Sequence, residues 1–171
     1  MTNKRISRDA LLIAIYCVLS SLTPIKITNF KLTFEAFPIL VAAIMFGPKD
    51  GLIVGTIGSF IYQLFLSGYG ISATTILWVL PHSLSGLVVG LYAKKYNFKL
   101  TFKQICFITI VSSILVTTLN SIVLYIDSLI YGYYFKGLIM GSIIIKVLVG
   151  IISSIIYSLI MPRLINFLKE V

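Results

Sequence analysis

The sequence predicts an all-α integral membrane protein, a bundle of six transmembrane helices with its N- and C-termini in the cytoplasm. Hydrophobic residues make up 58% of the 171 residues and charged residues only 11%, against roughly 25% charged residues in soluble domains. In a bilayer the backbone must satisfy its own hydrogen bonds, which leaves helices or a closed barrel. The long apolar runs lack the strict alternation of barrel strands, so helices are expected.

Breaks at Pro, Gly and clusters of charge divide the chain into apolar segments that are each about long enough for one span. The expected helices lie near residues 9–23, 34–48, 50–66, 73–93, 104–126 and 137–168. Between the second and third, Pro48 is expected to end one helix and Asp50 to cap the next, which predicts a hairpin. A single transmembrane domain over residues 1–171 accounts for the whole pattern.

The first expected helix follows a basic start, MTNKRISRDALLIAIYCVLSSLTP. No A-x-A-type cleavage site follows, so we interpret the segment as a retained helix and not as a signal peptide. Small residues recur at a spacing of four in three of the helices: Ala10-x-x-x-Ala14, Gly51-x-x-x-Gly55 and Gly86-x-x-x-Gly90. Small residues at this spacing share one helical face and let a neighbouring helix approach closely.

The chain has a net charge of +9, and most of its basic residues cluster in a few segments that alternate with the expected spans. The positive-inside rule then places the N-terminus in the cytoplasm, and an even number of spans returns the C-terminus there. The basic residues expected inside are Lys4, Arg5, Arg8, Lys49, Lys94, Lys95, Lys99, Lys103, Arg163 and Lys169. Such residues meet anionic membrane lipid, whereas nucleic-acid binding needs a continuous basic face on a soluble surface, and none is expected.

Most strongly polar residues within the expected spans fall in the outer half of the membrane. Polar side chains are costly there and tend to face a partner or a cavity, so we predict a pocket open to the outside. Trp78 and His82 share one helical face and offer a stacking surface beside a hydrogen-bonding group. Lys146 can offer a cation to a carboxylate, be neutralised by Glu35, or reach toward the headgroups. The candidate pocket residues are Glu35, Gln63, Thr75, Trp78, His82, Asn120, Tyr125 and Lys146.

Each of these residues also has a structural interpretation. His82 can satisfy helix packing, Trp78 can belong to an interfacial aromatic belt, and Asn120 can link helices. A small structural or assembly protein therefore stays an alternative. An enzyme is not expected, because His82 is the one histidine and no HExxH, GxSxG or Walker A motif occurs. Single cysteines without nearby histidines predict no metal site, and no cofactor is expected.

Nearly the whole chain resembles the S component of an energy-coupling factor (ECF) vitamin transporter, with the folate-type branch most similar. The resemblance rests on Ala10-x-x-x-Ala14, on FPILVAAIMFGPKDGLIVGTIGSFIYQL, on LPHSLSGLVVGLYAKK and on TTLNSIVLYI. It implies a multi-pass protein of a prokaryotic plasma membrane that captures a vitamin from outside. It also implies partners, namely a membrane T subunit and two ATPases, with Ala10 and Ala14 contacting the T subunit.

The resemblance favours folate or a related pterin as the substrate. An aromatic stack would hold the pterin and a cation would hold the glutamate carboxylate, roles that Trp78, Tyr69 and Lys146 can fill. Folate-type members often carry Phe-Pro-Gly-Phe-Thr before the fourth helix, where this chain has GYGISATTILW. A different vitamin or precursor with a ring and an acid group therefore stays open.

Overall fold

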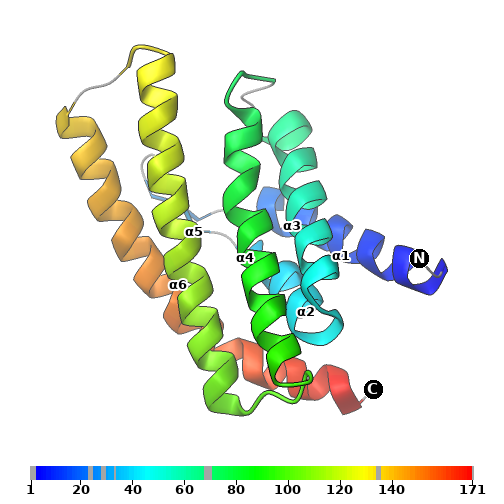
Figure 1. Ribbon diagram of the computed structural model, residues 1–171. Coiled ribbons are helices and arrows are strands. Elements are labelled where there is room, and N and C mark those ends of the chain that lie inside the picture. Colours follow the sequence, from blue (N-terminus) through cyan, green and yellow to red (C-terminus); the bar gives the residue numbers. More distant parts are fainter. Residues whose placement is uncertain are drawn as a thin grey trace.

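The computed structural model describes residues 3–22, 25–27, 30–32, 34–67, 71–133 and 136–170. Within these ranges the chain forms six α-helices, and the predicted helical bundle is confirmed (Figure 1). They are α1 (Asn3–Leu22), α2 (Ala36–Phe46), α3 (Pro48–Ile61), α4 (Thr75–Lys95), α5 (Phe102–Ile130) and α6 (Lys136–Glu170). A π-helical turn, η1 (Tyr62–Leu66), continues α3.

A short hairpin of two strands, which differs from the expected all-helical pattern, lies between α1 and α2. Strands β1 (Ile25–Ile27) and β2 (Phe30–Leu32) pair antiparallel, with Ile25 opposite Leu32. Each strand has only three residues, too few for a recognisable alternation of polar and apolar positions.

Three helices of the described ranges are long and apolar enough to cross a bilayer. They are Thr75–Lys95, Phe102–Ile130 and the part of α6 at Ile144–Leu168. Helix α2 is equally apolar in character but has only 11 residues. Figure 1 shows α4, α5 and the first part of α6 running side by side, while α1 crosses the bundle at a steep angle.

The last part of α6 turns across the lower end of the molecule (Figure 1), and Pro162 lies in this part. Proline has no backbone N–H, so the carbonyl four residues earlier loses its helical donor and the helix bends. That carbonyl belongs to Ser158, and it accepts a hydrogen bond of 3.2 Å from the Cys106 thiol of α5. The bend is thus supported from the neighbouring helix.

Helices α3 and α4 pack backbone against backbone through their glycines. A Cβ atom on Gly51 would lie 2.5 Å from the carbonyl oxygen of Gly86, and one on Gly55 would lie 2.5 Å from that of His82. Real Cβ atoms do not approach carbonyl oxygens so closely. The glycine spacing that predicted close packing is therefore confirmed at this pair of helices.

The turn between α2 and α3 differs in detail from the expectation. Gly47, with φ of 111°, separates the helices, and Pro48 opens α3 instead of ending α2. Asp50 does not cap α3. It lies in the first turn, is 3% exposed, and pairs with two arginines of α1.

These arginines explain why α1 begins at Asn3 and not near residue 9. Arg5 Nε lies 2.6 Å from Asp50 Oδ1, and Arg8 Nη2 lies 2.7 Å from the same oxygen. The Arg8 guanidinium also stacks on the Phe46 ring, 3.5 Å from its centroid. The basic start of the chain thus has buried partners, which hold it in helical form against α2 and α3.

Gly51→Ala is expected to destabilise the fold by about 1–3 kcal/mol, because the new methyl group would force α3 and α4 apart. The measurement is the apparent Tm of the purified protein in detergent. Gly141→Ala is the matched control, since nothing lies within 4 Å of a Cβ atom there. Equal Tm values for the two variants would contradict the close packing of α3 on α4.

Candidate functional site

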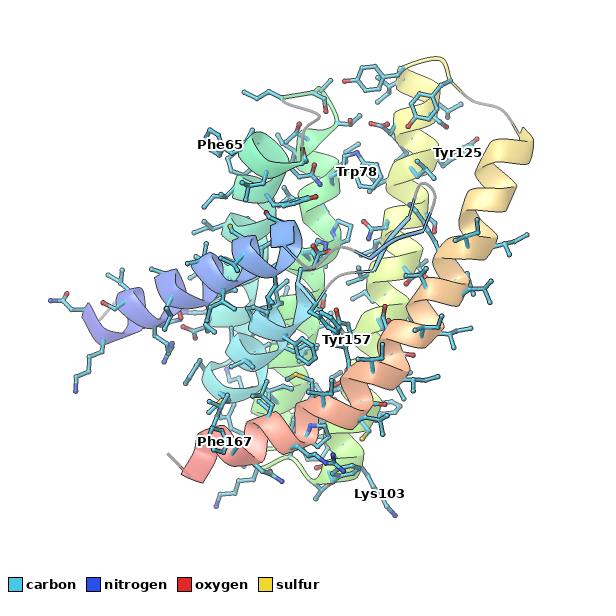
Figure 2. The ribbon with its side chains drawn as sticks, turned by 180° about the vertical axis from the view of Figure 1, so that it is seen from behind. Phe65, Trp78, Lys103, Tyr125, Tyr157 and Phe167 are labelled. Atoms are coloured by element: carbon cyan, nitrogen blue, oxygen red, sulfur yellow. The ribbon has the colours of Figure 1, made fainter. Side chains whose placement is uncertain are left out.

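One face of α4 carries a column of polar side chains along the interior of the bundle. Thr74, at the start of the helix, Trp78 and His82 follow one another at intervals of four and therefore point to one side. Opposite them, α5 presents Asn120 and Asp127, which lie two turns apart on one face. Figure 2 shows Trp78 in the space between α4 and α5.

The outer layer of this site, which is the part nearest the start of α4 and is expected to face outward, centres on the carboxylate of Asp127. It accepts hydrogen bonds from the hydroxyl groups of Thr74 and Tyr133. The indole Nε1 of Trp78 lies 3.5 Å from Asp127 Oδ1. Thr74 is 1% exposed, so this carboxylate ties the outer end of α4 to α5 in a partly dry environment.

Lys146 brings α6 to the same layer. Its Nζ donates a hydrogen bond of 3.0 Å to the backbone carbonyl of Asn120 and lies 5.4 Å from the centre of the Trp78 ring. That distance is within the range of a cation–π interaction. No carboxylate of the described residues forms an ion pair with Lys146, so Glu35 does not neutralise it.

The deeper layer lies about one turn along α4. Glu35 Oε1 is 3.6 Å from His82 Nε2, and the side chains of Glu35 and His82 are 19% and 12% exposed. The Tyr16 ring of α1 meets the His82 imidazole edge-on, with 5.8 Å between ring centres. Tyr157 of α6, which Figure 2 places at the centre of the molecule, packs edge-on against Phe37 at 4.7 Å.

The structure brings together Glu35, Trp78, His82, Asn120 and Lys146 of the predicted site. Asp127 and Thr74 were missed, although both occupy its outer layer. The sequence carried a signal for Asp127, since it is a lone acid seven positions after Asn120. The helix expected at residues 104–126 ends before Asp127, whereas α5 continues to Ile130.

Two other predicted residues make local contacts with the backbone. Thr75 is 4% exposed, and its hydroxyl accepts a hydrogen bond from the backbone of Ser72, so it shapes the turn before α4. Gln63 lies in η1, where its carbonyl accepts a hydrogen bond from the hydroxyl of Ser67. Tyr69 lies outside the described residues.

Tyr125 faces away from the column. It is two residues from Asp127, which rotates it by about 200° around α5. It is 45% exposed and lines a groove of about 350 Å³ between α5 and α6, together with Thr117, Ser121 and Val147. Figure 2 places Tyr125 beside α5 and apart from Trp78. Its expected depth in the membrane predicts a pocket residue, but its side chain points to the side of α5 that faces away from α4.

The arrangement is suited to non-covalent binding. It offers an aromatic face, a cation, two carboxylates and an imidazole along one interior column, and these groups match a flat ring with polar edges. Within the part of the chain that the structure describes, no three His, Cys, Asp or Glu side chains gather as a metal site would require.

Asp127→Ala is expected to lower the stability by about 1–3 kcal/mol, because the buried Thr74 hydroxyl and the Trp78 N–H would lose their acceptor. Asp127→Asn keeps an acceptor oxygen and should lose less. Thermal unfolding monitored by the emission of Trp78, the one tryptophan of the chain, measures both variants. The assignment of Asp127 as the shared acceptor fails if the two substitutions lower the Tm equally.

Comparison with known proteins identifies the family. The sequence-family model described as ECF-type riboflavin transporter, S component, matches residues 1–166. A solved S component of a bacterial ECF transporter shares 29% identity at a TM-score of 0.68, over 99% of both chains. FolT bound with folic acid has a TM-score of 0.75 at 23% identity, over 96% of this chain and 94% of that one. The S component for biotin from an ECF-type ABC transporter has a TM-score of 0.64 at 20% identity, so these last two show the fold alone.

Curated relatives match a shorter region. The UPF0397 protein of Streptococcus pneumoniae (strain Hungary19A-6) is 42% identical over 72 residues, which is 42% of this chain and 36% of the relative. The match therefore spans little more than a third of that relative's length. The resemblance to S components is confirmed over nearly the full chain by the family model. This protein belongs to the family of ECF-type riboflavin transporter S components.

Proposed function

We propose that this protein captures a vitamin from outside the cell membrane and passes it to an ATP-driven transport module. The observation that carries the proposal is that Asp127 of α5 and Lys146 of α6 both approach the Trp78 side chain of α4, while Lys146 also binds the backbone carbonyl of Asn120. Polar side chains inside a membrane protein are costly and tend to face a partner or a cavity. Their gathering in one half of the bundle therefore favours a binding pocket. The family to which the chain belongs supports the same function.

The substrate that fits these groups is a vitamin with a flat, fused heteroaromatic ring. Riboflavin has such a ring, and the description of the matching family names it. Folate or a related pterin is the second candidate, because Lys146 offers a cation that can pair with the glutamate carboxylate of folate, whereas riboflavin has no carboxylate. Both ligands would stack on Trp78.

Transport would require partners. The sequence has no Walker A motif, so ATP hydrolysis would be supplied by two ATPase subunits acting through a membrane T subunit. Ala10 and Ala14 both lie on the exposed side of α1, beside Leu11 and Val18, which are 61% and 51% exposed. We propose this small-residue, apolar face as the contact with the T subunit. The basic residues expected inside would keep both termini in the cytoplasm.

Trp78→Ala is expected to weaken vitamin binding about tenfold or more, because the ligand would lose its stacking surface. Equilibrium dialysis against riboflavin, folate, biotin and thiamine measures the affinity in detergent. Tyr125→Ala is the matched aromatic control, since Tyr125 lies on the far side of α5. Failure of the folded wild type to bind any of the four vitamins would overturn the proposed function.

Lys146→Met separates the two candidate substrates. If the ligand is folate, the loss of the cation should weaken binding by about tenfold or more, whereas riboflavin binding should change only a few-fold. Lys103→Met is the control, because Lys103 lies at the opposite end of the molecule (Figure 2). A drop in Tm for Lys146→Met and Trp78→Ala with unchanged affinity for every vitamin would favour a purely structural role.

A further inference from the structure

A cavity of mixed polar and apolar lining lies at the end of the molecule opposite the Trp78 layer. It has a volume of about 490 Å³ and sits where the start of α1, the turn between α2 and α3, and the end of α4 meet. Four basic and two aromatic residues line it together with the carboxylate of Asp50: Arg5, Arg8, Phe46, Lys49, Lys94 and Phe98. The vitamin site does not use any of these residues.

The charges of this cavity do not balance. Arg5 and Arg8 are paired with Asp50, and Arg8 also lies 3.2 Å from Asp9 Oδ1. Two carboxylates therefore offset the two guanidinium groups. Lys49 and Lys94 form no ion pair with any residue that the structure describes. The cavity thus keeps an excess of positive charge, which attracts an anion.

The arginines are held in place before any anion arrives. Their bonds to Asp9 and Asp50 use Nε and Nη2, which leaves Nη1 of each without a hydrogen bond to the described part of the chain. The Arg8 guanidinium also lies over the Phe46 ring, and this contact holds it beside the cavity. Hydrogen bonding to Asp50 raises the pKa of Arg5 above its ordinary value. Fixed, charged donors of this kind favour phosphate oxygens.

The position of the cavity indicates where such a phosphate would come from. The apolar span of α4 ends at Lys95, so Lys94 lies at the depth of the lipid headgroups. Phe46 and Phe98 add an apolar wall beside the basic residues. We propose that this cavity binds the phosphate group of an anionic phospholipid in the cytoplasmic leaflet. The lipid would thereby hold together the start of α1, the turn at Gly47 and the end of α4.

Native mass spectrometry of the full chain in detergent, titrated with phosphatidylglycerol or phosphatidylcholine, tests this site. The wild type is expected to retain phosphatidylglycerol in preference. A basic residue near an anionic surface contributes about fivefold to binding, so the double variant Lys49→Gln/Lys94→Gln should weaken retention roughly 25-fold. The matched control is Lys99→Gln/Lys103→Gln, which removes the same charge from the same end without altering the cavity lining.

Equal loss of phosphatidylglycerol from the two double variants would overturn the proposal, as would equal retention of the two lipids by the wild type. A parallel titration with inorganic phosphate separates the sources of the group. Thermal stabilisation by phosphate but not by phosphatidylglycerol would overturn the assignment to lipid. Vitamin affinity, measured on the same samples, should be unchanged in both double variants, so this proposal and the proposed vitamin capture fail independently.

Discussion

The backbone contact between α3 and α4 places the helix from which the candidate site is built. At Gly55 the backbone of α3 lies so close to the carbonyl of His82 that even a methyl group would not fit between them. The contact of Gly51 with Gly86 repeats this approach one turn further along. Since Trp78 and His82 project from the face of α4 that turns inward, the separation of α3 from α4 sets how far both side chains reach toward α5 and α6. Small residues in α3 thus act on the site without touching a ligand.

Two carboxylates close the bundle at opposite ends of this helix pair. Asp50 gathers Arg5 and Arg8 and so fixes α1 to the start of α3. Asp127 accepts from Thr74 and from Tyr133, which fixes α4 to the end of α5. Each carboxylate accepts hydrogen bonds from a helix that is distant from it in the sequence. The side chains that surround the two carboxylates differ. Asp127 adjoins the aromatic and cationic groups of the candidate site, and Asp50 adjoins the basic cavity.

The sequence predicted what depends on local composition and spacing. Apolar runs gave the helices, glycines four apart gave the α3–α4 contact, and the interval between Trp78 and His82 gave one face of the site. Position along each helix was also predictable, because it follows from counting residues. The direction in which a side chain points around its helix was not predictable, because it depends on which neighbouring helix covers each side. Tyr125 therefore lies on a different face of α5 from the one expected. The contacts of Asp127 with Thr74 and of Asp50 with Arg5 join residues far apart in the chain, which local spacing does not predict.

The central claim is that a flat vitamin ring binds against Trp78. Because the chain has one tryptophan, its fluorescence reports on this position alone. Titration of the purified protein with riboflavin and with folate, excited at the indole band and corrected for absorption by the ligand, measures the claim directly. Saturable quenching at one ligand per chain, at concentrations that match binding by equilibrium dialysis, is the predicted result. A vitamin that binds by dialysis while the Trp78 emission stays unchanged would contradict the account.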